Sequence, residues 1–95
     1  MIFEWDGPKN RANIAKHRIA FELAALVFSD PNRLDDLNRI VGGEVRRQVI
    51  GAAGDTLLVL FVVYTERSNR GQETIRIISA RTASRKERSR YTRLQ

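Results

Sequence analysis

The sequence predicts an α+β domain with helices near the N-terminus, then antiparallel strands, and a helix at the C-terminus. Two observations support this fold class. Apolar residues recur at helical spacing up to residue 28, and three later segments have apolar strand patterns joined by short turns. The 95 residues, of which 42% are hydrophobic and 29% charged, suit a folded chain with one core. We therefore expect a single domain over residues 1–95.

The N-terminal segment contains an edge strand and a capped helix. Ile2–Trp5 alternates weakly in polarity and ends at a turn, where Asp6 can cap a helix that has Pro8 in its first turn. We expect this helix to end near His17. Four polar residues share one of its faces because they are spaced by helical turns: Lys9, Asn13, Lys16 and His17.

A second helix and three strands follow. Helical spacing relates four apolar residues: Phe21, Ala24, Ala25 and Phe28. We expect Leu34–Gly43 to be a loop, because its polar residues and its paired glycines disfavour a strand. Strands are expected at residues 44–50, 56–65 and 75–80, and the short turns between them, at 53–55 and 68–71, predict an antiparallel meander.

The last third of the chain combines an apolar strand with a basic helix. The strand Ile75–Arg81 precedes a helix that begins with a capping box, in which Ser84 and Glu87 each accept a hydrogen bond from the other's backbone N–H. Residues 81–95 carry a net charge of +5, out of +6 for the whole chain. Such a concentrated positive charge is typical of a surface that binds nucleic acid or an acidic partner.

The composition excludes several classes of protein. The chain has no cysteine and one histidine, so it has no disulfide, no thiolate zinc site and no recognisable metal-ligand cluster; we expect no metal and no cofactor. Its longest apolar run, residues 57–64, is much shorter than the roughly 20 residues that cross a bilayer. The N-terminus lacks the pattern of a secretory signal, so we expect a cytoplasmic protein.

The remaining polar residues suit cleavage of RNA without a metal. That reaction needs a base for the 2′-hydroxyl, cations for the phosphate and an acid for the leaving 5′-oxygen. Guanidinium groups bind phosphate through two parallel hydrogen bonds and stay charged. The candidates are His17 or Glu66 as the base, Tyr91 as a proton donor or stacking residue, and for the phosphate Arg67, Arg76, Arg81 and Arg88.

Each candidate also has a structural interpretation. Glu87 can serve simply as a helix cap, and Tyr91 can anchor the helix to the sheet. A lone histidine such as His17 is more often structural. Arg76 lies between isoleucines, so it is either a solvated residue of a sheet edge or a charge in a pocket. The other cations of the helix more often form a solvated or partner-facing surface: Arg85, Lys86, Arg90 and Arg93.

Several short motifs occur in order along the chain: Phe3–Asp6, Lys16-His17, Phe21-Glu22, Val27–Pro31, Thr65–Arg67, Ile75–Arg81, and Glu87-Arg88 followed by Tyr91. Together they resemble the BrnT family of bacterial toxins. The strand Ile-Arg-Ile-Ile-Ser-Ala-Arg followed by Glu-Arg-x-x-Tyr is the most specific part, and the resemblance covers nearly the whole chain. The sequence departs from the family at Arg18, where glycine is usual, and in residues 68–73, which form a longer segment than usual.

The resemblance implies a RelE-like fold, with two N-terminal helices packed on an antiparallel β-sheet and a C-terminal helix. It also implies a toxin of a type II toxin–antitoxin system. Such a toxin is a ribonuclease that blocks translation and is neutralised by a BrnA-type antitoxin, whose ribbon-helix-helix part binds operator DNA. The positions that match family motifs are Lys16, His17, Arg67, Arg76, Arg81, Glu87, Arg88 and Tyr91.

The sequence leaves two functions open. The first is a metal-independent endoribonuclease in which Arg76 and Arg81 hold the scissile phosphate, Tyr91 or Arg88 assists at the base or leaving group, and further cations bind the RNA backbone: Lys16, Arg85, Lys86, Arg90 and Arg93. The second is a non-catalytic module whose basic helix only binds nucleic acid or an acidic protein. The expected partners are RNA and the antitoxin, with operator DNA bound only through the antitoxin and no membrane.

Overall fold

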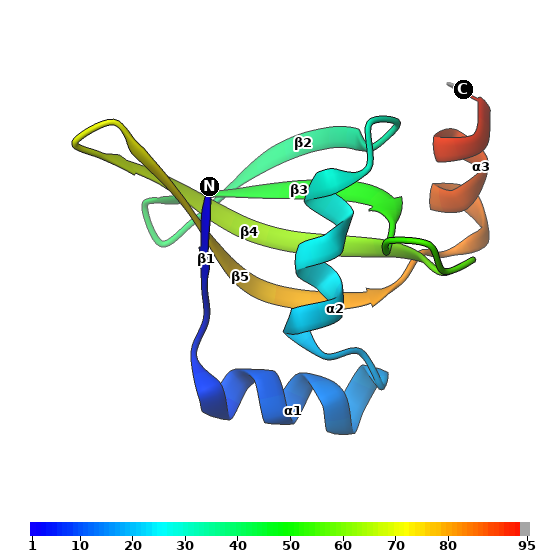
Figure 1. Ribbon diagram of the computed structural model, residues 1–95, viewed down its shortest axis with the longest axis horizontal. Helices are drawn as coiled ribbons and strands as arrows, with labels where there is room; N and C mark the ends of the chain where they lie inside the picture. Colours follow the sequence, from blue (N-terminus) through cyan, green and yellow to red (C-terminus); the bar gives the residue numbers. More distant parts are fainter. Residues whose placement is uncertain (94–95) are drawn as a thin grey trace.

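The computed structural model describes residues 1–93, apart from the side chains of residues 36, 37 and 69, and shows a mixed α+β fold (Figure 1). The described strands form one five-stranded sheet in the order β1-β5-β4-β3-β2. Strand β1 is parallel to β5, and the other neighbours are antiparallel. In chain order the elements are β1 (Ile2–Glu4), α1 (Gly7–His17), α2 (Phe21–Ala25), the 3-10 helix η1 (Leu26–Ser29), β2 (Leu34–Val41), β3 (Glu44–Ala52), β4 (Val59–Asn69), β5 (Gln72–Thr82) and α3 (Arg85–Arg93).

The N-terminal elements confirm the predictions for this segment. Strand β1 lies at one edge of the sheet, and Asp6 Oδ2 accepts a hydrogen bond of 3.0 Å from the backbone N–H of Lys9 at the start of α1. Pro8 is in the first turn of α1, where its missing N–H costs nothing. The second predicted helix divides into α2 and η1, and Phe28 belongs to η1.

The predicted loop at Leu34–Gly43 is wrong, because residues 34–41 form strand β2. Gly42 and Gly43, with φ of 57° and 81°, make the turn to β3. Strand β2 is the second edge of the sheet and pairs with β3, with a register shift between Asp36 and Arg39. An edge strand tolerates polar residues since much of its surface is solvated, which is why its composition does not indicate a strand.

The hairpin of β4 and β5 also differs from the predicted turn at residues 68–71. The strands continue to Asn69 and from Gln72, so the turn consists of Arg70 and Gly71, both with positive φ (54° and 76°). Two such residues are typical of a type I′ hairpin turn. The extra residues of segment 68–73 therefore lengthen two strands.

The core lies between one face of the sheet and the helices α1, α2 and η1. We call this face the helix side. Its buried residues include Phe21, Ala24 and Val27 from the helical segments and Val49, Leu60, Val62, Ile75, Ile77 and Ala80 from the strands. Gly51 lets η1 approach β3 closely, because a Cβ at this position would lie 2.7 Å from Val27 Cγ1.

Two asparagines attach α1 to its neighbours. Asn13 Nδ2 donates to the backbone oxygens of Ile19 and Ala80 at 2.8 Å each, and its Oδ1 accepts from the Ala80 N–H at 3.2 Å. Asn10 Oδ1 accepts from the Phe21 N–H at 2.9 Å. Asn13 is therefore buried while Lys16 is exposed, so the polar residues predicted to share one face of this helix divide between core and surface.

Arg18 ends α1 in the left-handed conformation, with φ of 62°, and its N–H donates to the Ile14 oxygen at 2.8 Å. This is the conformation that glycine adopts at helix ends without strain. The chain therefore keeps the turn at the position where the family usually has glycine.

Helix α3 lies beyond the ends of β3 and β5, away from α1 (Figure 1). Its predicted capping box is confirmed: the Ser84 N–H donates to Glu87 Oε1 at 2.8 Å and the Glu87 N–H donates to Ser84 Oγ at 3.2 Å. None of the described α3 residues is buried. In residues 1–93, no helix is long and apolar enough to cross a membrane.

Candidate functional site

The alternation of residues along β5 places its arginines on the sheet face opposite the helix side. Ile75 and Ile77 are buried on the helix side, so Arg76 between them points the other way. Thr65 is paired with Arg76, and Arg67 with Thr74, which places Thr65 and Arg67 on the same face as Arg76. We call it the arginine face after its five arginines: Arg39, Arg46, Arg67, Arg76 and Arg81.

One row of the arginine face crosses all the strands of the sheet. Arg47 is paired with Tyr64, so Arg46 occupies the adjoining row beside Thr65. Arg39 is paired with Arg46, and Arg76 is paired with Thr65 on one side and Glu4 on the other. We call this set the arginine row: Arg39, Arg46, Thr65, Arg76 and Glu4.

Two polar atoms of the arginine row are buried and make no hydrogen bond with any described residue: Thr65 Oγ1 and Arg46 Nε. Thr65 is only 5% exposed. Glu44 Oε1 lies 3.5 Å from Arg46 Nε, which is an ion-pair distance without hydrogen-bond geometry. A buried polar group left unsatisfied costs roughly 1–3 kcal/mol, so these atoms need an explanation, and a bound polar ligand is one.

Arg76 keeps most of its hydrogen-bonding capacity. Its Nη1 lies 3.6 Å from Glu4 Oε1, and the two side chains are 38% and 40% exposed. A guanidinium has five N–H donors in a planar fork, and this long contact engages few of them. Arg76 can therefore bind an anion on the arginine face while Glu4 stays beside it.

Arg81, at the other end of β5, has its guanidinium paired with a carboxylate and next to an aromatic ring. Its Nη1 and Nη2 donate to the two carboxylate oxygens of Glu87 at 2.8 and 2.9 Å, and its Cζ lies 4.2 Å from the centroid of the Phe61 ring. The hydrogen bond from Arg81 lowers the pKa of Glu87, and the same bond raises the pKa of Arg81. Arg81 thus attaches α3 to the sheet.

Tyr91 makes a second attachment of α3. Its hydroxyl donates to Asp30 Oδ2 at 2.5 Å, and Asp30 also accepts from the backbone N–H groups of Ala52 and Asn32 at 2.8 and 2.9 Å. Burial raises the pKa of Asp30, but the hydrogen bonds from Tyr91, Ala52 and Asn32 outweigh it and leave the pKa below its ordinary value. The sequence did not single out Asp30 as a partner of Tyr91.

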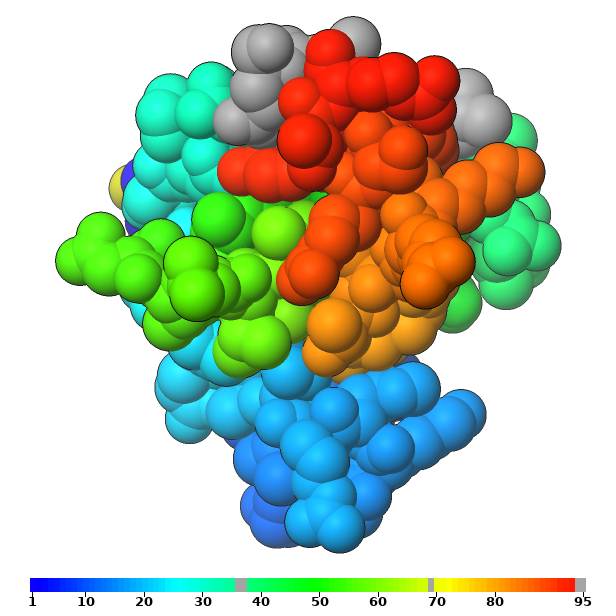
Figure 2. Space-filling model, turned by 90° about the vertical axis from the view of Figure 1, so that its right-hand side faces the viewer, coloured from blue at the N-terminus to red at the C-terminus, as the bar shows by residue number. Residues whose placement is uncertain are grey.

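The other predicted site residues divide between two helices. Arg90 is partly buried on α3, and four more cations of α3 are exposed: Arg85, Lys86, Arg88 and Arg93. Lys16 and His17 end α1, and Figure 2 shows α1 and α3 at opposite ends of the molecule. The structure therefore does not bring His17 together with Arg88 and Tyr91.

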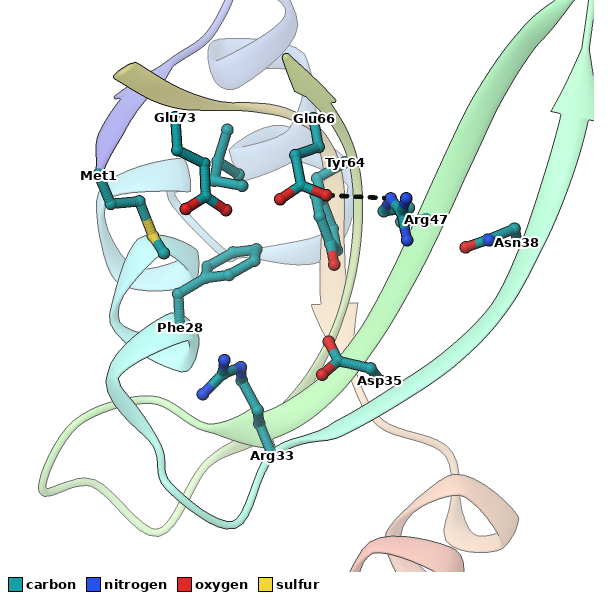
Figure 3. Close-up of a pocket in the computed structure, with 10 residues that line it drawn as sticks. Met1, Phe28, Arg33, Asp35, Asn38, Arg47, Tyr64, Glu66 and Glu73 are labelled. Carbon is teal, nitrogen blue, oxygen red and sulfur yellow. Dashed lines mark ion pairs between the residues drawn. The ribbon is translucent and has the colours of Figure 1, made fainter. Parts of the chain in front are cut away.

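The helix side of the sheet carries a separate pocket of about 270 Å³, shown in Figure 3. Arg47 Nε lies 3.2 Å from Glu66 Oε2 in this pocket. A hydrogen bond with Glu73, together with burial, raises the pKa of Glu66, and burial raises the pKa of Tyr64 to about 12. Glu66 is paired with Ile75 and so lies on the helix side. The hypothesis of one site that combines Glu66 as a base with Arg76 is therefore wrong.

Among the described residues, no group of three or more histidine, cysteine, aspartate or glutamate side chains is placed to hold a metal ion.

A family model described as "Ribonuclease toxin, BrnT, of type II toxin-antitoxin system" matches residues 5–87. The chain belongs to the BrnT family. It is thus a ribonuclease toxin of the type II toxin–antitoxin class, which implies an antitoxin partner. No curated protein matches the chain.

The motifs that carry the BrnT resemblance meet in two places. Asp30, Arg81, Glu87 and Tyr91 come together where β5 ends and α3 begins. Thr65 and Arg76 come together in the arginine row with Glu4. The first group is internally paired, whereas in the second Thr65 Oγ1 has no hydrogen-bond partner among the described residues.

Sequence reasoning missed four members of the arginine row: Glu4, Arg39, Arg46 and Thr65. Glu4 and Thr65 occur in BrnT motifs, but their proximity depends on β1 pairing in parallel with β5 from the far end of the chain. Arg46 and Arg47 are neighbours in β3, so their side chains point to opposite faces of the sheet. Which of the two lies on the arginine face follows only from the register of β3 and β4. Alternation within β4 was the available signal for Thr65, because it places Thr65 and Arg67 on one face.

Proposed function

We propose that this BrnT toxin is a RelE-like, metal-independent endoribonuclease that cuts RNA on the arginine face. The observation that carries the proposal is the arginine row, in which a buried hydroxyl and a buried guanidinium nitrogen lack hydrogen-bond partners among the described residues. A phosphodiester carries one negative charge shared by its two non-bridging oxygens, and these oxygens accept hydrogen bonds. RNA bound on this face would therefore place acceptors beside both groups.

The row contains the cations that a phosphate needs. Arg46 and Arg76 flank Thr65 on neighbouring strands, and Arg67 lies on the same face one pair along β4. Arginine stays charged and can bind two phosphate oxygens at once, which stabilises the additional charge that develops on a five-coordinate phosphorus. Arg81 is less available than Arg76 to bind a phosphate, because its Nη1 and Nη2 already donate to Glu87.

Glu4 is the proposed general base, in place of His17. Its carboxylate lies 3.6 Å from Arg76 and so beside the bound phosphate, whereas His17 is on α1, which packs on the helix side. Glu4 removes the proton of the 2′-hydroxyl, the 2′-oxygen bonds to phosphorus, and the bond from phosphorus to the 5′-oxygen breaks. The leaving 5′-oxygen takes a proton from water, because the predicted donors Tyr91 and Arg88 lie on α3, beyond the end of β5 and apart from the arginine row.

The products identify this reaction. Antitoxin-free toxin should cut single-stranded RNA in the presence of EDTA and leave a 2′,3′-cyclic phosphate and a 5′-hydroxyl. The same oligonucleotide with 2′-deoxyribose at the cleaved position should stay intact. Free RNA and ribosome-bound mRNA should be tested separately. Intact RNA in both assays, with and without Mg²⁺, would reject the proposed activity.

A non-catalytic module is the second candidate, and the exposed cations of α3 favour it: Arg85, Lys86, Arg88 and Arg93. These residues can bind RNA backbone without any chemistry. The two candidates differ in how cleavage and affinity respond to Arg76→Ala. Loss of cleavage with less than a tenfold loss of RNA affinity, about 1.4 kcal/mol, supports the enzyme. Equal loss of both supports the module.

The proposal also includes the cellular role of the toxin. RNA cleavage in the cytoplasm would block translation, and a BrnA-type antitoxin with a ribbon-helix-helix part would neutralise the toxin and carry it to operator DNA. The concentrated positive charge of residues 81–93 supports binding of RNA backbone along α3.

A further inference from the structure

The β2–β3 hairpin exposes apolar residues on the helix side of the sheet. Ile40 and Val45 are directly paired and are 75% and 46% exposed. Val45, Arg47 and Val49 alternate along β3, and Val49 is in the core, so the exposed pair lies on the helix side beyond the cover of η1. Exposed branched apolar side chains that face one another across two strands are typical of a protein interface.

The pocket of the helix side continues this surface. In Figure 3 Asn38 and Arg47 line the part of the pocket toward β2 and β3, two positions along from Ile40 and Val45 respectively. Phe28 and Tyr64 form an aromatic wall, with ring centroids 4.9 Å apart and planes at 89°. The apolar pair and the pocket together form one surface, which we call the hairpin surface.

The charges of the pocket suit a cationic side chain. Its lining contains three carboxyl groups, from Asp35, Glu66 and Glu73, and two guanidinium groups, from Arg33 and Arg47, in a chain whose net charge is +6. The carboxyl groups of Glu66 and Glu73 both line this pocket, with the Phe28 ring close to them in Figure 3. A guanidinium or ammonium group between these two carboxyl groups would offset their repulsion and also contact the aromatic wall.

We propose that the antitoxin docks on the hairpin surface, with apolar residues over Ile40 and Val45 and an arginine or lysine side chain in the pocket beside Glu66 and Glu73. An anchor side chain in a pocket surrounded by apolar contacts is the common arrangement of strong protein interfaces. Strand β2 is a free edge between the two faces, so an antitoxin that docks here can continue round it toward the arginine face. The proposal rests on the antitoxin partner of the family and does not depend on the ribonuclease chemistry.

The test measures the affinity of refolded, full-length toxin for its cognate antitoxin. The Ile40→Ser/Val45→Ser and Glu66→Gln/Glu73→Gln variants should each bind at least tenfold more weakly. Leu57→Ser is the matched control, because Leu57 is 96% exposed in the loop between β3 and β4, and its affinity should change less than twofold. Unfolding midpoints and RNA cleavage should match those of the wild type, since no altered residue belongs to the arginine face.

Two outcomes would overturn the proposal. If both double variants bind the antitoxin as the wild type does, while Arg85→Ala/Lys86→Ala weakens binding, the antitoxin docks on α3. If the hairpin variants abolish self-association of the free toxin and leave antitoxin affinity unchanged, the surface joins two toxin copies. If the wild-type toxin cuts no RNA but the double variants still lose antitoxin affinity, the ribonuclease mechanism is rejected and this interface is supported.

Discussion

Arg76 and Arg81 lie on the same strand and the same sheet face, yet their guanidinium groups have different surroundings. Arg81 makes two hydrogen bonds of 2.8 and 2.9 Å to Glu87 and lies over the Phe61 ring. Arg76 has a contact of 3.6 Å with Glu4 and lies next to a buried hydroxyl that has no partner in the described residues. The first arginine attaches α3 to the sheet, and the second is the one that we propose to bind an anion.

The difference shows that two arginines of one family motif can differ in how their guanidinium groups are paired. Both arginines match the BrnT pattern, and composition cannot separate them. Their neighbours do separate them: the Glu87 carboxylate accepts from both Nη1 and Nη2 of Arg81, whereas Arg76 has one long contact and lies beside the buried Thr65 hydroxyl.

The largest expected effect is on RNA cleavage by Arg76→Ala. Removing one preorganised donor to a charged transition state typically costs about 10²–10³ in rate, and we expect a fall of about 10²-fold with an unchanged unfolding midpoint. Arg76→Lys should recover little, because a lysine cannot form the bidentate contact. Arg11→Ala, which removes an exposed charge from α1, is the matched control and should cleave RNA at the wild-type rate. Wild-type cleavage by Arg76→Ala would refute the assignment.

The second effect is on stability, through Arg81 and Glu87. Hydrogen bonds to charged groups contribute roughly 1.5–3 kcal/mol when buried, but the Arg81 side chain is 38% exposed, so we expect Glu87→Gln to lower the free energy of unfolding by about 1–2 kcal/mol at pH 7. Because the pKa of Glu87 is lowered in the folded state, this stability is present above its ordinary value of 4.5 and is lost as pH falls through the folded pKa. Urea unfolding of the wild type and of Glu87→Gln at pH 7 and pH 3 measures the stability difference and its dependence on pH. An equal difference between wild type and variant at both pH values contradicts this account.

The third prediction uses Thr65→Val, which removes the unsatisfied hydroxyl and keeps the shape of the side chain. Stability should increase by about 0.5–1 kcal/mol, since a buried polar group without a partner is removed. Cleavage of RNA should decrease by about tenfold if the hydroxyl binds a phosphate oxygen. An increase in stability together with a decrease in cleavage is the predicted result. A variant that is more stable and fully active would show that the hydroxyl binds no substrate.

The smallest expected effect is that of Arg18→Gly. A non-glycine residue in the left-handed region costs roughly 1–2 kcal/mol, and the greater flexibility of glycine in the unfolded chain offsets part of this, so we expect a net gain of about 0.5–1 kcal/mol. Thermal unfolding measures the gain, and RNA cleavage should not change. Arg70→Gly, at the other described arginine with positive φ, should behave similarly, whereas a loss of stability in Arg18→Gly would mean that its side chain makes a necessary contact.

Local signals in the sequence predicted much of the fold. The Asp6 cap, the helix ending at His17, the Ser84–Glu87 capping box and the three central strands were all indicated by residues close together in the chain. Strand β2 was missed because an edge strand can be polar, and Asp35 and Asp36 resemble loop residues. The division of the second helix depends on packing of η1 against Gly51, which is distant in sequence.

The candidate site was less predictable, because it depends on pairing between distant segments. The sequence indicated Arg67 and Arg76, but Glu4 joins them only when β1 is placed parallel to β5. The link between Tyr91 and Asp30 and the separation of Glu66 from Arg76 likewise follow from the topology. Residue type identified cations, whereas register decided which of them lie together.

A crystal structure of the toxin with an RNA that carries a 2′-O-methyl group at the cleaved position tests the central claim most directly. The account predicts a phosphate oxygen within about 2.7–3.0 Å of Thr65 Oγ1, with the guanidinium groups of Arg46 and Arg76 on the same phosphate and the Arg81–Glu87 pair intact. A scissile phosphate bound by Arg81 with that pair broken, and nothing bound at Thr65, would contradict it.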